Sequence, residues 1–256
     1  MPRLVATDLD GTALRSDGTV SARTAAAFAL IEEAGATLVF VTGRPPRWMR
    51  QVSHAVQHRG LAICANGALF YDLHTQRMVE SHPIAPEIMT EVVARLRGSV
   101  PELAFAVEYE AGYAGEPAFG GNAVDRRAKP DAAAGQAVKL LALHPRLDPE
   151  DFHTRVQDLV GDLVTTTYSS GRALVEMSAL GVTKATALAV LAERLGIKPA
   201  ETVAFGDMPN DLPMLAWAGT SYAVANAHPR VLAAADQVIA ANDADGVAEM
   251  IEKLYR

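Results

Sequence analysis

The chain has very little cysteine and no long apolar run. Its single cysteine, Cys64, excludes an internal disulfide bond. Asp, Arg, Gly or Pro interrupts every apolar stretch before it reaches the roughly 20 residues that a membrane-spanning helix needs. The opening Met-Pro-Arg-Leu-Val-Ala-Thr-Asp also lacks the apolar core of a secretory signal peptide. We therefore expect a soluble protein of the cytoplasm.

Clusters of positive charge are missing as well. Asp and Glu number 30 against 23 Lys and Arg, the formal net charge is -7, and no run of Lys or Arg stands out. We therefore expect neither nucleic acid nor a membrane as a partner. Half of the 256 residues are apolar, which is enough for a large core and excludes a disordered or fibrous protein. The composition leaves the oligomeric state open.

Short apolar runs alternate with helical patterns in the first and last thirds of the chain. This alternation is typical of a parallel sheet covered by helices. We expect an α/β fold whose core, residues 1–81 and 180–256, is a Rossmann-like doubly wound parallel sheet. The main predicted elements are strands at 4–7, 37–41, 202–205, 222–224 and 237–239 and helices at 21–34, 45–58, 184–195, 209–217 and a last one ending at 254.

The middle of the chain, residues 82–179, has a different texture. It holds several prolines and a Gly-rich loop at 112–121. Helical and strand-like segments are mixed here, and the strands are spaced as in hairpins. We interpret this segment as an inserted α+β cap domain. Its predicted elements are helices at 86–96 and 149–160 and strands at 104–109, 163–168 and 173–177.

The strongest chemical signal is Asp8-Leu9-Asp10-Gly11-Thr12, which directly follows the first predicted strand. Ligands of parallel sheets bind at the carboxyl ends of the strands. The alternate spacing of Asp8 and Asp10 allows both carboxylates to face one crevice, and Gly11 allows the chain to turn away at once. The alternative is an ordinary acidic turn, because Asp-Gly is also common in hairpins.

A second signal, Thr42-Gly43-Arg44, closes the next predicted strand. A hydroxyl and free N–H groups at the turn from a strand to a helix suit a bound phosphate. Taken alone this signal is weak, because Thr and Pro at a helix start also explain it without any ligand.

Lys184 is the third signal, because it begins a predicted helix after Thr183. The helix dipole disfavours a cation in the first turn. A bound phosphate would resolve this conflict, whereas a solvated lysine would tolerate it at a small cost.

The fourth signal is Gly206-Asp207-Met208-Pro209-Asn210-Asp211, again at the end of a predicted strand. Carboxylate and amide oxygens suit Mg²⁺, and no set of His and Cys with zinc spacing competes. A capped helix start would explain Asp207 but not four acids at two strand ends.

Together these residues resemble the haloacid dehalogenase superfamily of phosphotransferases. More narrowly, the chain is similar to the Cof-like phosphatases of type IIB, whose cap is inserted between the second and third motifs. All four motifs occur in family order. Accessory stretches of the family occur at 65–68, 226–229 and 242–248. Across 82–179 the resemblance rests on size and texture only.

The resemblance implies a role for each motif residue. Asp8 would attack phosphorus, and Asp10 would act as general acid toward the leaving alcohol and then as base toward water. The Asp8 side chain, the Asp10 backbone carbonyl and Asp207 would hold Mg²⁺, with Asp211 supporting them. The phosphate oxygens would be held by the N–H groups of Leu9 and Gly43 and by Thr42, Lys184 and Asn210.

Several other residues are weaker candidates. His54 and His58 could be drawn as a metal site, but a solvated helix face explains them better. Cys64 is more typical of a core residue than of a nucleophile. Arg44 and Arg47 could reach a substrate or be solvated. In the cap, Glu108, Tyr109 and Tyr113 could contact the leaving group, although a structural role for the glycines beside them is favoured.

Hydrolysis of a small phosphate ester, such as a sugar phosphate, is the function that this pattern favours. A phosphomutase with the same phosphoaspartate and a noncatalytic module that binds a phosphorylated metabolite remain alternatives. The noncatalytic module is disfavoured, because a protein that only senses a metabolite needs no nucleophile beside an acid. The sequence does not identify the substrate.

Overall fold

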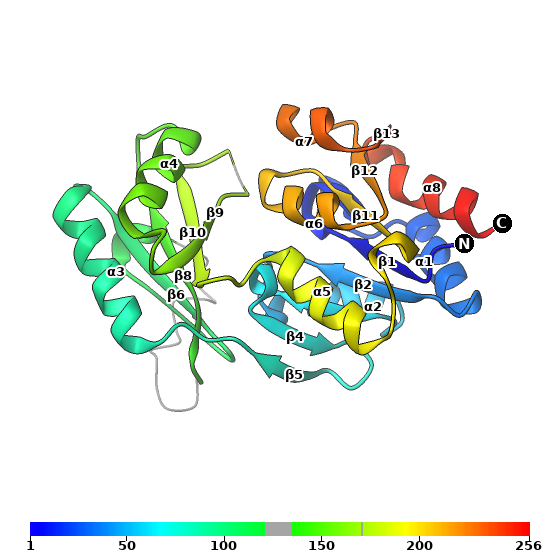
Figure 1. The fold of residues 1–256 in the computed structure, drawn as a ribbon, viewed down its shortest axis with the longest axis horizontal. Helices are drawn as coiled ribbons and strands as arrows, with labels where there is room; N and C mark the ends of the chain where they lie inside the picture. Colours follow the sequence, from blue (N-terminus) through cyan, green and yellow to red (C-terminus); the bar gives the residue numbers. More distant parts are fainter. Residues whose placement is uncertain (121–134, 170) are drawn as a thin grey trace. The chain divides into compact units, whose positions relative to one another are not determined.

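The computed structural model describes residues 1–120, 135–169 and 171–256 (Figure 1). Its contacts divide the chain into two compact units. Unit 1 contains residues 1–80 and 184–256, and unit 2 contains residues 81–183. Position 121, the end of the Gly-rich loop named above, lies outside the described residues. No helix in these ranges is long and apolar enough to cross a membrane.

Unit 1 is built on an eight-stranded sheet. The six strands from β13 to β3 run parallel to their neighbours, which confirms the predicted α/β class with a parallel sheet. Hydrophobic runs form the middle of this sheet, and every residue of one of them, Leu4–Thr7, is buried. In order across the sheet, the strands are β13 (Gln237–Ile239), β12 (Thr220–Val224), β11 (Thr202–Gly206), β1 (Leu4–Thr7), β2 (Thr37–Val41), β3 (Leu61–Cys64), β4 (Leu69–Asp72) and β5 (Arg77–Ser81).

Helices cover this sheet on both faces, and strands β1 and β11 are therefore buried along their whole length. Helix α1 packs against α8, and α5 packs against α6. The side chain of Ser21 caps α1 by accepting a hydrogen bond from the Thr24 N–H. The helices of unit 1 are α1 (Ala22–Glu33), α2 (Met49–Ala55), α5 (Lys184–Arg194), α6 (Leu212–Trp217), α7 (Pro229–Ala234) and α8 (Gly246–Tyr255).

Strand β1 lies between β2 and β11, so the first and last thirds of the chain meet in the middle of the sheet (Figure 1). Leu4 is paired with Thr37 on one side and with Thr202 on the other. Three parallel neighbours therefore end at one edge. The segments that follow them begin with Asp8, Thr42 and Asp207.

Two parts of unit 1 differ from the sequence-based expectation. Strands β3, β4 and β5 were not predicted, and β4 runs antiparallel to β3, so the parallel sheet is extended on one side by a strand of opposite direction. The helix predicted at 45–58 is shorter: a single turn at Pro46–Trp48 leads into α2, which ends at Ala55. Gln57 and His58 have positive φ angles, which a continuing α-helix does not allow.

In its described residues, unit 2 is an antiparallel five-stranded sheet with two α-helices. The three predicted strands are present as β6, β9 and β10, whereas β7 and the central strand β8 were not predicted. In sheet order the strands are β7 (Tyr113–Gly115), β6 (Ala104–Tyr109), β8 (Ala137–Leu143), β10 (Leu174–Ala179) and β9 (Val164–Thr167). The helices are α3 (Pro86–Ser99) and α4 (Pro149–Val160).

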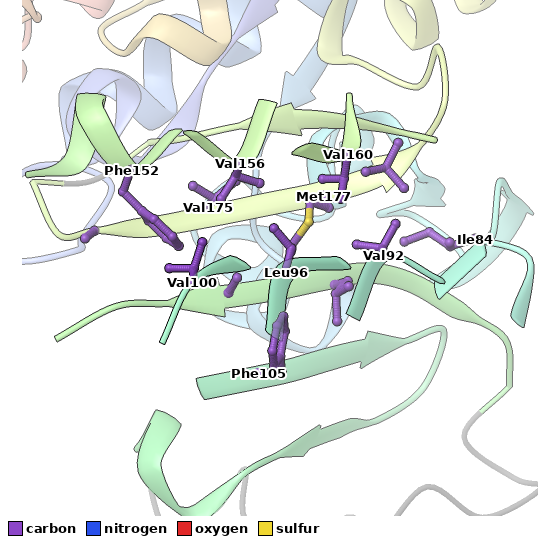
Figure 2. Packing of buried hydrophobic residues seen from close by; sticks show 14 residues of the cluster. Ile84, Val92, Leu96, Val100, Phe105, Phe152, Val156, Val160, Val175 and Met177 are labelled. Atoms are coloured by element: carbon purple, nitrogen blue, oxygen red, sulfur yellow. The ribbon is translucent and has the colours of Figure 1, made fainter. Parts of the chain in front are cut away.

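Both helices of unit 2 pack on the same face of this sheet. Leu96 of α3 and Val156 of α4 are fully buried and meet strand residues such as Val175 (Figure 2). The spacing of apolar residues along each helix supplies this stripe. Unit 2 therefore has a hydrophobic core of its own.

Candidate active site

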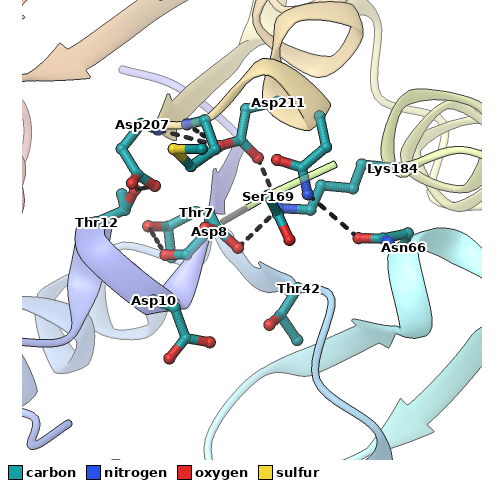
Figure 3. Close-up of polar contacts among 12 residues, drawn as sticks. Thr7, Asp8, Asp10, Thr12, Thr42, Asn66, Ser169, Lys184, Asp207 and Asp211 are labelled. Atoms are coloured by element: carbon teal, nitrogen blue, oxygen red, sulfur yellow. Dashed lines mark hydrogen bonds and ion pairs between the residues drawn. The ribbon is translucent and has the colours of Figure 1, made fainter. Parts of the chain in front are cut away.

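The site is built where β1, β2 and β11 end in unit 1 (Figure 3). Asp8 is the first residue after β1, and its backbone N–H donates to the Phe205 carbonyl oxygen at 3.0 Å. Asp207 is the first residue after β11. The backbone pairing of β1 with β11 thus brings together two carboxylates that lie far apart in the sequence.

Three carboxylates form a buried cluster. Asp8, Asp207 and Asp211 each offer an oxygen, and these oxygens all lie within 4.8 Å of one another. The three residues are only 5 %, 6 % and 0 % exposed. Carboxylates held this close in a poorly solvated site repel one another, so the cluster needs positive charge.

Lys184 supplies one positive charge to this cluster. Its Nζ donates to Asp8 Oδ1 at 2.8 Å and to Asp211 Oδ1 at 2.7 Å, and its side chain is almost completely buried. Helix α5 begins at this residue. Two carboxylates therefore offset the unfavourable position of a cation in the first turn of a helix.

The pKa values reflect the crowding of these charges. Burial, then repulsion from Asp211 and Asp207, raises the pKa of Asp8 well above its usual range, although Lys184 opposes the shift. Burial, then repulsion from Asp211, raises the pKa of Asp207 to about 6. Burial alone would lower the pKa of Lys184, but attraction to Asp211 and Asp8 outweighs it and raises that pKa. One lysine does not balance the three acids.

Asp211 shapes the loop that carries Asp207. Its Oδ2 accepts hydrogen bonds from the backbone N–H groups of Asp207 and Met208, both at 3.0 Å. Gly206 is required beside it, because a Cβ there would lie 2.6 Å from the Asp211 Cβ. Asp211 thus fixes both Lys184 and the turn after β11.

Thr12 and Gly11 orient Asp207 from the other side. The Thr12 hydroxyl donates to Asp207 Oδ1 at 2.7 Å. Gly11 has a φ of 78°, and a Cβ at this position would overlap the Asp207 carboxylate. The motif after β1 therefore holds a residue of the motif after β11, a role for Thr12 that the sequence did not indicate.

The Asp10 side chain lies outside the acidic cluster. Its two carboxylate oxygens accept hydrogen bonds from Arg44, Oδ2 from Nε at 2.7 Å and Oδ1 from Nη2 at 2.6 Å. Arg44 was only a weak candidate in the sequence. The predicted use of the Asp10 backbone carbonyl as a metal ligand stays a prediction.

The turn after β2 is held by backbone and side-chain hydrogen bonds. Thr42 is fully buried, its hydroxyl accepts from the Arg44 N–H at 3.1 Å, and its carbonyl accepts from the Asn66 N–H at 3.0 Å. Asn210 donates to Asn66 Oδ1 at 3.3 Å. Asn66 follows β3, has a positive φ and lies in the accessory stretch 65–68 of the family.

The phosphate-binding roles expected for Leu9, Gly43, Thr42, Lys184 and Asn210 are not tested by these contacts. Thr42, Lys184 and Asn210 lie in the hydrogen-bonded network of the site. The Leu9 side chain is buried and does not enter this network. These roles remain predictions.

The accessory stretches near the end of the sequence support the same loops. Asn226 donates to the Gly11 carbonyl at 2.7 Å, and its side-chain oxygen accepts from the Asn242 N–H at 3.0 Å. The His228 N–H donates to the Asp207 carbonyl at 2.8 Å. Both stretches therefore fix the loops that carry the acids.

The weaker candidates lie outside the acidic cluster. The His54 and His58 rings contact each other, and the Ser53 hydroxyl lies 2.8 Å from His58 Nδ1. Among the described residues, the only group suited to a metal ion is the cluster of three acids. Cys64 is a buried residue of β3.

Two observations test whether these residues fit a divalent cation. The cluster has more acids than nearby cations, and the raised pKa of Asp207 shows that a further positive charge would be stabilising. In addition, Asn210 Oδ1 is buried and accepts no hydrogen bond in the described part of the chain. A hydrated cation would offer both charge and hydrogen-bond donors. The donor set is all oxygen, which fits Mg²⁺.

Comparison with known proteins agrees with this geometry. The family model described as haloacid dehalogenase-like hydrolase matches residues 5–251. The HMP-PP phosphatase of Serratia proteamaculans is 30% identical over 255 residues, covering 90% of this chain and 86% of the relative.

Two further proteins resemble the whole chain. The 5-amino-6-(5-phospho-D-ribitylamino)uracil phosphatase of Bacillus subtilis is 27% identical over 250 residues, covering 97% of this chain and 94% of the relative. A solved sugar phosphatase of haloacid dehalogenase subclass IIB has the same fold, with a TM-score of 0.80, 20% identity and 98% of each chain covered. The resemblance predicted from the motifs is therefore confirmed, and the chain belongs to the haloacid dehalogenase-like hydrolases.

Proposed function

We propose that this phosphatase of the haloacid dehalogenase-like family hydrolyses a small phosphorylated metabolite through a phosphoaspartate on Asp8. The observation that carries the proposal is the position of Asp8, a buried carboxylate at the end of a central parallel strand, bonded to Lys184 and next to Asp207. A carboxylate nucleophile divides one difficult displacement at phosphorus into two easier steps.

In the first step an oxygen of Asp8 bonds to phosphorus while the bond from phosphorus to the leaving alcohol breaks. Asp10, in its protonated form, gives its proton to the alcohol oxygen. In the second step water attacks the phosphorus of phosphoaspartate and gives a proton to Asp10. The bond from phosphorus to Asp8 breaks, inorganic phosphate leaves and Asp8 is restored.

Lys184 serves this chemistry by holding Asp8 in place and by offering positive charge to the phosphoryl oxygens. Thr42 and Asn210 are the polar side chains assigned to the remaining oxygens. Asp8, Asp207 and the backbone carbonyl of Asp10 would hold Mg²⁺, with Asp211 supporting them. When bound, this cation reduces the repulsion between an anionic nucleophile and an anionic phosphate.

The relatives and the two-unit architecture support the proposed substrate class. The two curated relatives described above act on different phosphorylated metabolites, so the shared chemistry lies in the phosphate ester and not in one leaving group. Unit 2 is assigned the role of a cap that selects the leaving group. We therefore propose a small phosphomonoester, such as a sugar phosphate, as the substrate.

The test is a panel of phosphorylated metabolites, with and without Mg²⁺, in which phosphate release is measured. Wild-type protein is expected to release phosphate only with Mg²⁺, and Asp8→Asn is expected to release none. The Asn side chain keeps an oxygen that accepts from Lys184, so this variant is expected to fold, which circular dichroism and thermal unfolding check.

Phosphoprotein trapped after acid quenching gives an independent measurement, because an acyl phosphate is cleaved by hydroxylamine. Hydroxylamine-sensitive phosphoprotein that is trapped from wild type but not from Asp8→Asn supports the proposal. Ordinary turnover by Asp8→Asn would rule out the phosphoaspartate. Transfer of phosphate between hydroxyls without release would identify a phosphomutase instead.

A further inference from the structure

Arg44 and Asp10 form an ion pair with an unusual distribution of exposure. The Asp10 side chain is 59% exposed, whereas that of Arg44 is only 16% exposed. The guanidinium bonds both carboxylate oxygens, at 2.6 and 2.7 Å. This pair differs from an ordinary exposed ion pair in its geometry. Its two parallel hydrogen bonds fix both the position and the rotation of the carboxylate.

The backbone on the Arg44 side of the pair is held by two hydrogen bonds. The Arg44 N–H donates to the Thr42 hydroxyl at 3.1 Å, and the Arg44 carbonyl accepts from the Ala65 N–H at 3.0 Å. Asp10 instead lies in the turn between Leu9 and Ala13, where its own φ and ψ and those of Gly11 are not helical. A fixed arginine therefore holds an acid that its exposure would otherwise leave free to rotate.

We propose that Arg44 is a positioning residue that holds the carboxyl group of Asp10 in the orientation from which, once protonated, it gives its proton to the leaving alcohol. This proposal rests on the proposed function, because it assigns a partner to the acid named there. Both oxygens of Asp10 are bonded to Arg44, so one bond opens when that oxygen meets the substrate. The other bond keeps the carboxylate in orientation.

Leaving-group dependence tests the proposal. An alkyl phosphate needs a proton from Asp10 as its bond to phosphorus breaks, whereas the leaving group of p-nitrophenyl phosphate is stable as an anion. Arg44→Met is expected to lower kcat for a simple alkyl phosphate by roughly 10- to 100-fold, which is less than the roughly 100- to 10,000-fold contribution of a general acid, because Asp10 itself is still present. Its kcat for p-nitrophenyl phosphate should change less than about threefold, and its KM for both esters should stay near wild type.

Two further variants test whether Arg44 influences kcat through Asp10. Arg44→Lys retains the charge but not the two-pronged geometry, so its kcat for the alkyl phosphate should lie between wild type and Arg44→Met. The double variant Asp10→Asn with Arg44→Met should be no slower than Asp10→Asn alone, since both changes remove the same contribution. Arg23→Met is the matched control, because Arg23 bonds both oxygens of Glu252 in unit 1 in the same way.

Nuclear magnetic resonance of the metal-free protein gives a readout that does not depend on turnover. The Nε–Hε signal of Arg44 should be sharp in wild type and should move in Asp10→Asn. It should not move in a control in which Glu252 is changed to Gln. An Arg44 signal that Asp10→Asn leaves unchanged would show that the pair does not exist in solution and would overturn the proposal.

The outcomes separate this proposal from the proposed function. Equal losses of Arg44→Met on both esters, with a raised KM, would show that Arg44 binds the phosphate itself and would overturn its positioning role alone. Additive losses in the double variant would do the same. If Asp10→Asn showed no dependence on the leaving group, the acid would be misassigned, and both proposals would fail at Asp10.

Discussion

Gly11 shows how closely a single residue is matched to the acid it faces. Gly11→Ala places a methyl group against the Asp207 carboxylate in a backbone conformation that L residues avoid. We expect the displaced carboxylate to raise the Mg²⁺ concentration needed for half-maximal activity and to lower activity by roughly 100-fold. Titration of activity with Mg²⁺ measures both effects.

Gly18→Ala is the control for this change. Gly18 has a φ of 81°, close to that of Gly11, but a Cβ there meets nothing within 4 Å. Both variants therefore carry the same backbone strain, about 1–2 kcal/mol. Equal loss of activity in the two variants would show that strain, and not the contact with Asp207, is responsible.

Asp207 also predicts how stability depends on pH in metal-free protein. Burial, then repulsion from Asp211, raises its pKa to about 6, above the value near 3.9 of an unfolded chain. The folded state then binds more protons than the unfolded state, so this group lowers stability as pH rises from about 4 to about 6. The penalty is fully present above that window and absent below it, and it is on the order of 3 kcal/mol at most.

Asp207→Asn removes this penalty. With a chelator present, the melting temperature of the variant minus that of wild type should increase between about pH 4 and pH 7 and then level off. Saturating Mg²⁺ at neutral pH should reverse the order by stabilising wild type more strongly. A difference that stays constant over the whole pH range would contradict the assigned charge crowding.

At the scale of elements, the strands that carry the acids were the easiest to predict. Each is a short apolar run that ends directly at a polar motif, as at Thr7 and Gly206. Strand β8 was missed because its run Ala-Val-Lys-Leu-Leu-Ala-Leu consists of residues that also favour helices, so only its pairing with β6 and β10 decides its conformation. Strand β5 was missed because its exposed residues do not alternate.

Only those parts of the site that the ends of the strands position could be predicted from the sequence. Parallel strands share an edge, so the meeting of Asp8 with Asp207 follows from the sheet. The bond from Arg44 to Asp10 and that from Asn210 to Asn66 depend on loop conformations, including the positive φ of Ala65 and Asn66. No periodic pattern in the sequence encodes such conformations.

At the scale of the whole molecule, separate cores predict separate responses to mutation. Leu96→Ala removes a fully buried side chain from the core of unit 2 and should cost about 2–5 kcal/mol. Hydrogen exchange is expected to accelerate in α3, α4 and the strands of unit 2, while β1 and β11 keep their protection.

Leu38→Ala is the matched change in unit 1, since Leu38 is a nearly fully buried residue of β2. It should accelerate exchange in unit 1 and leave α3 and α4 protected. If either variant accelerated exchange in both units to the same extent, the two would unfold as one cooperative body.

The position of β1 between β2 and β11 also sets the order in which the enzyme can mature on the ribosome. Asp8 and Lys184 are 176 positions apart, and all of unit 2 is synthesised between them. A nascent chain that ends before α5 contains Asp8 but not Lys184, while unit 2 has already been synthesised and is available to fold. The cluster of Asp8, Asp207 and Asp211 with its lysine can therefore form only after the last third of the chain has been translated.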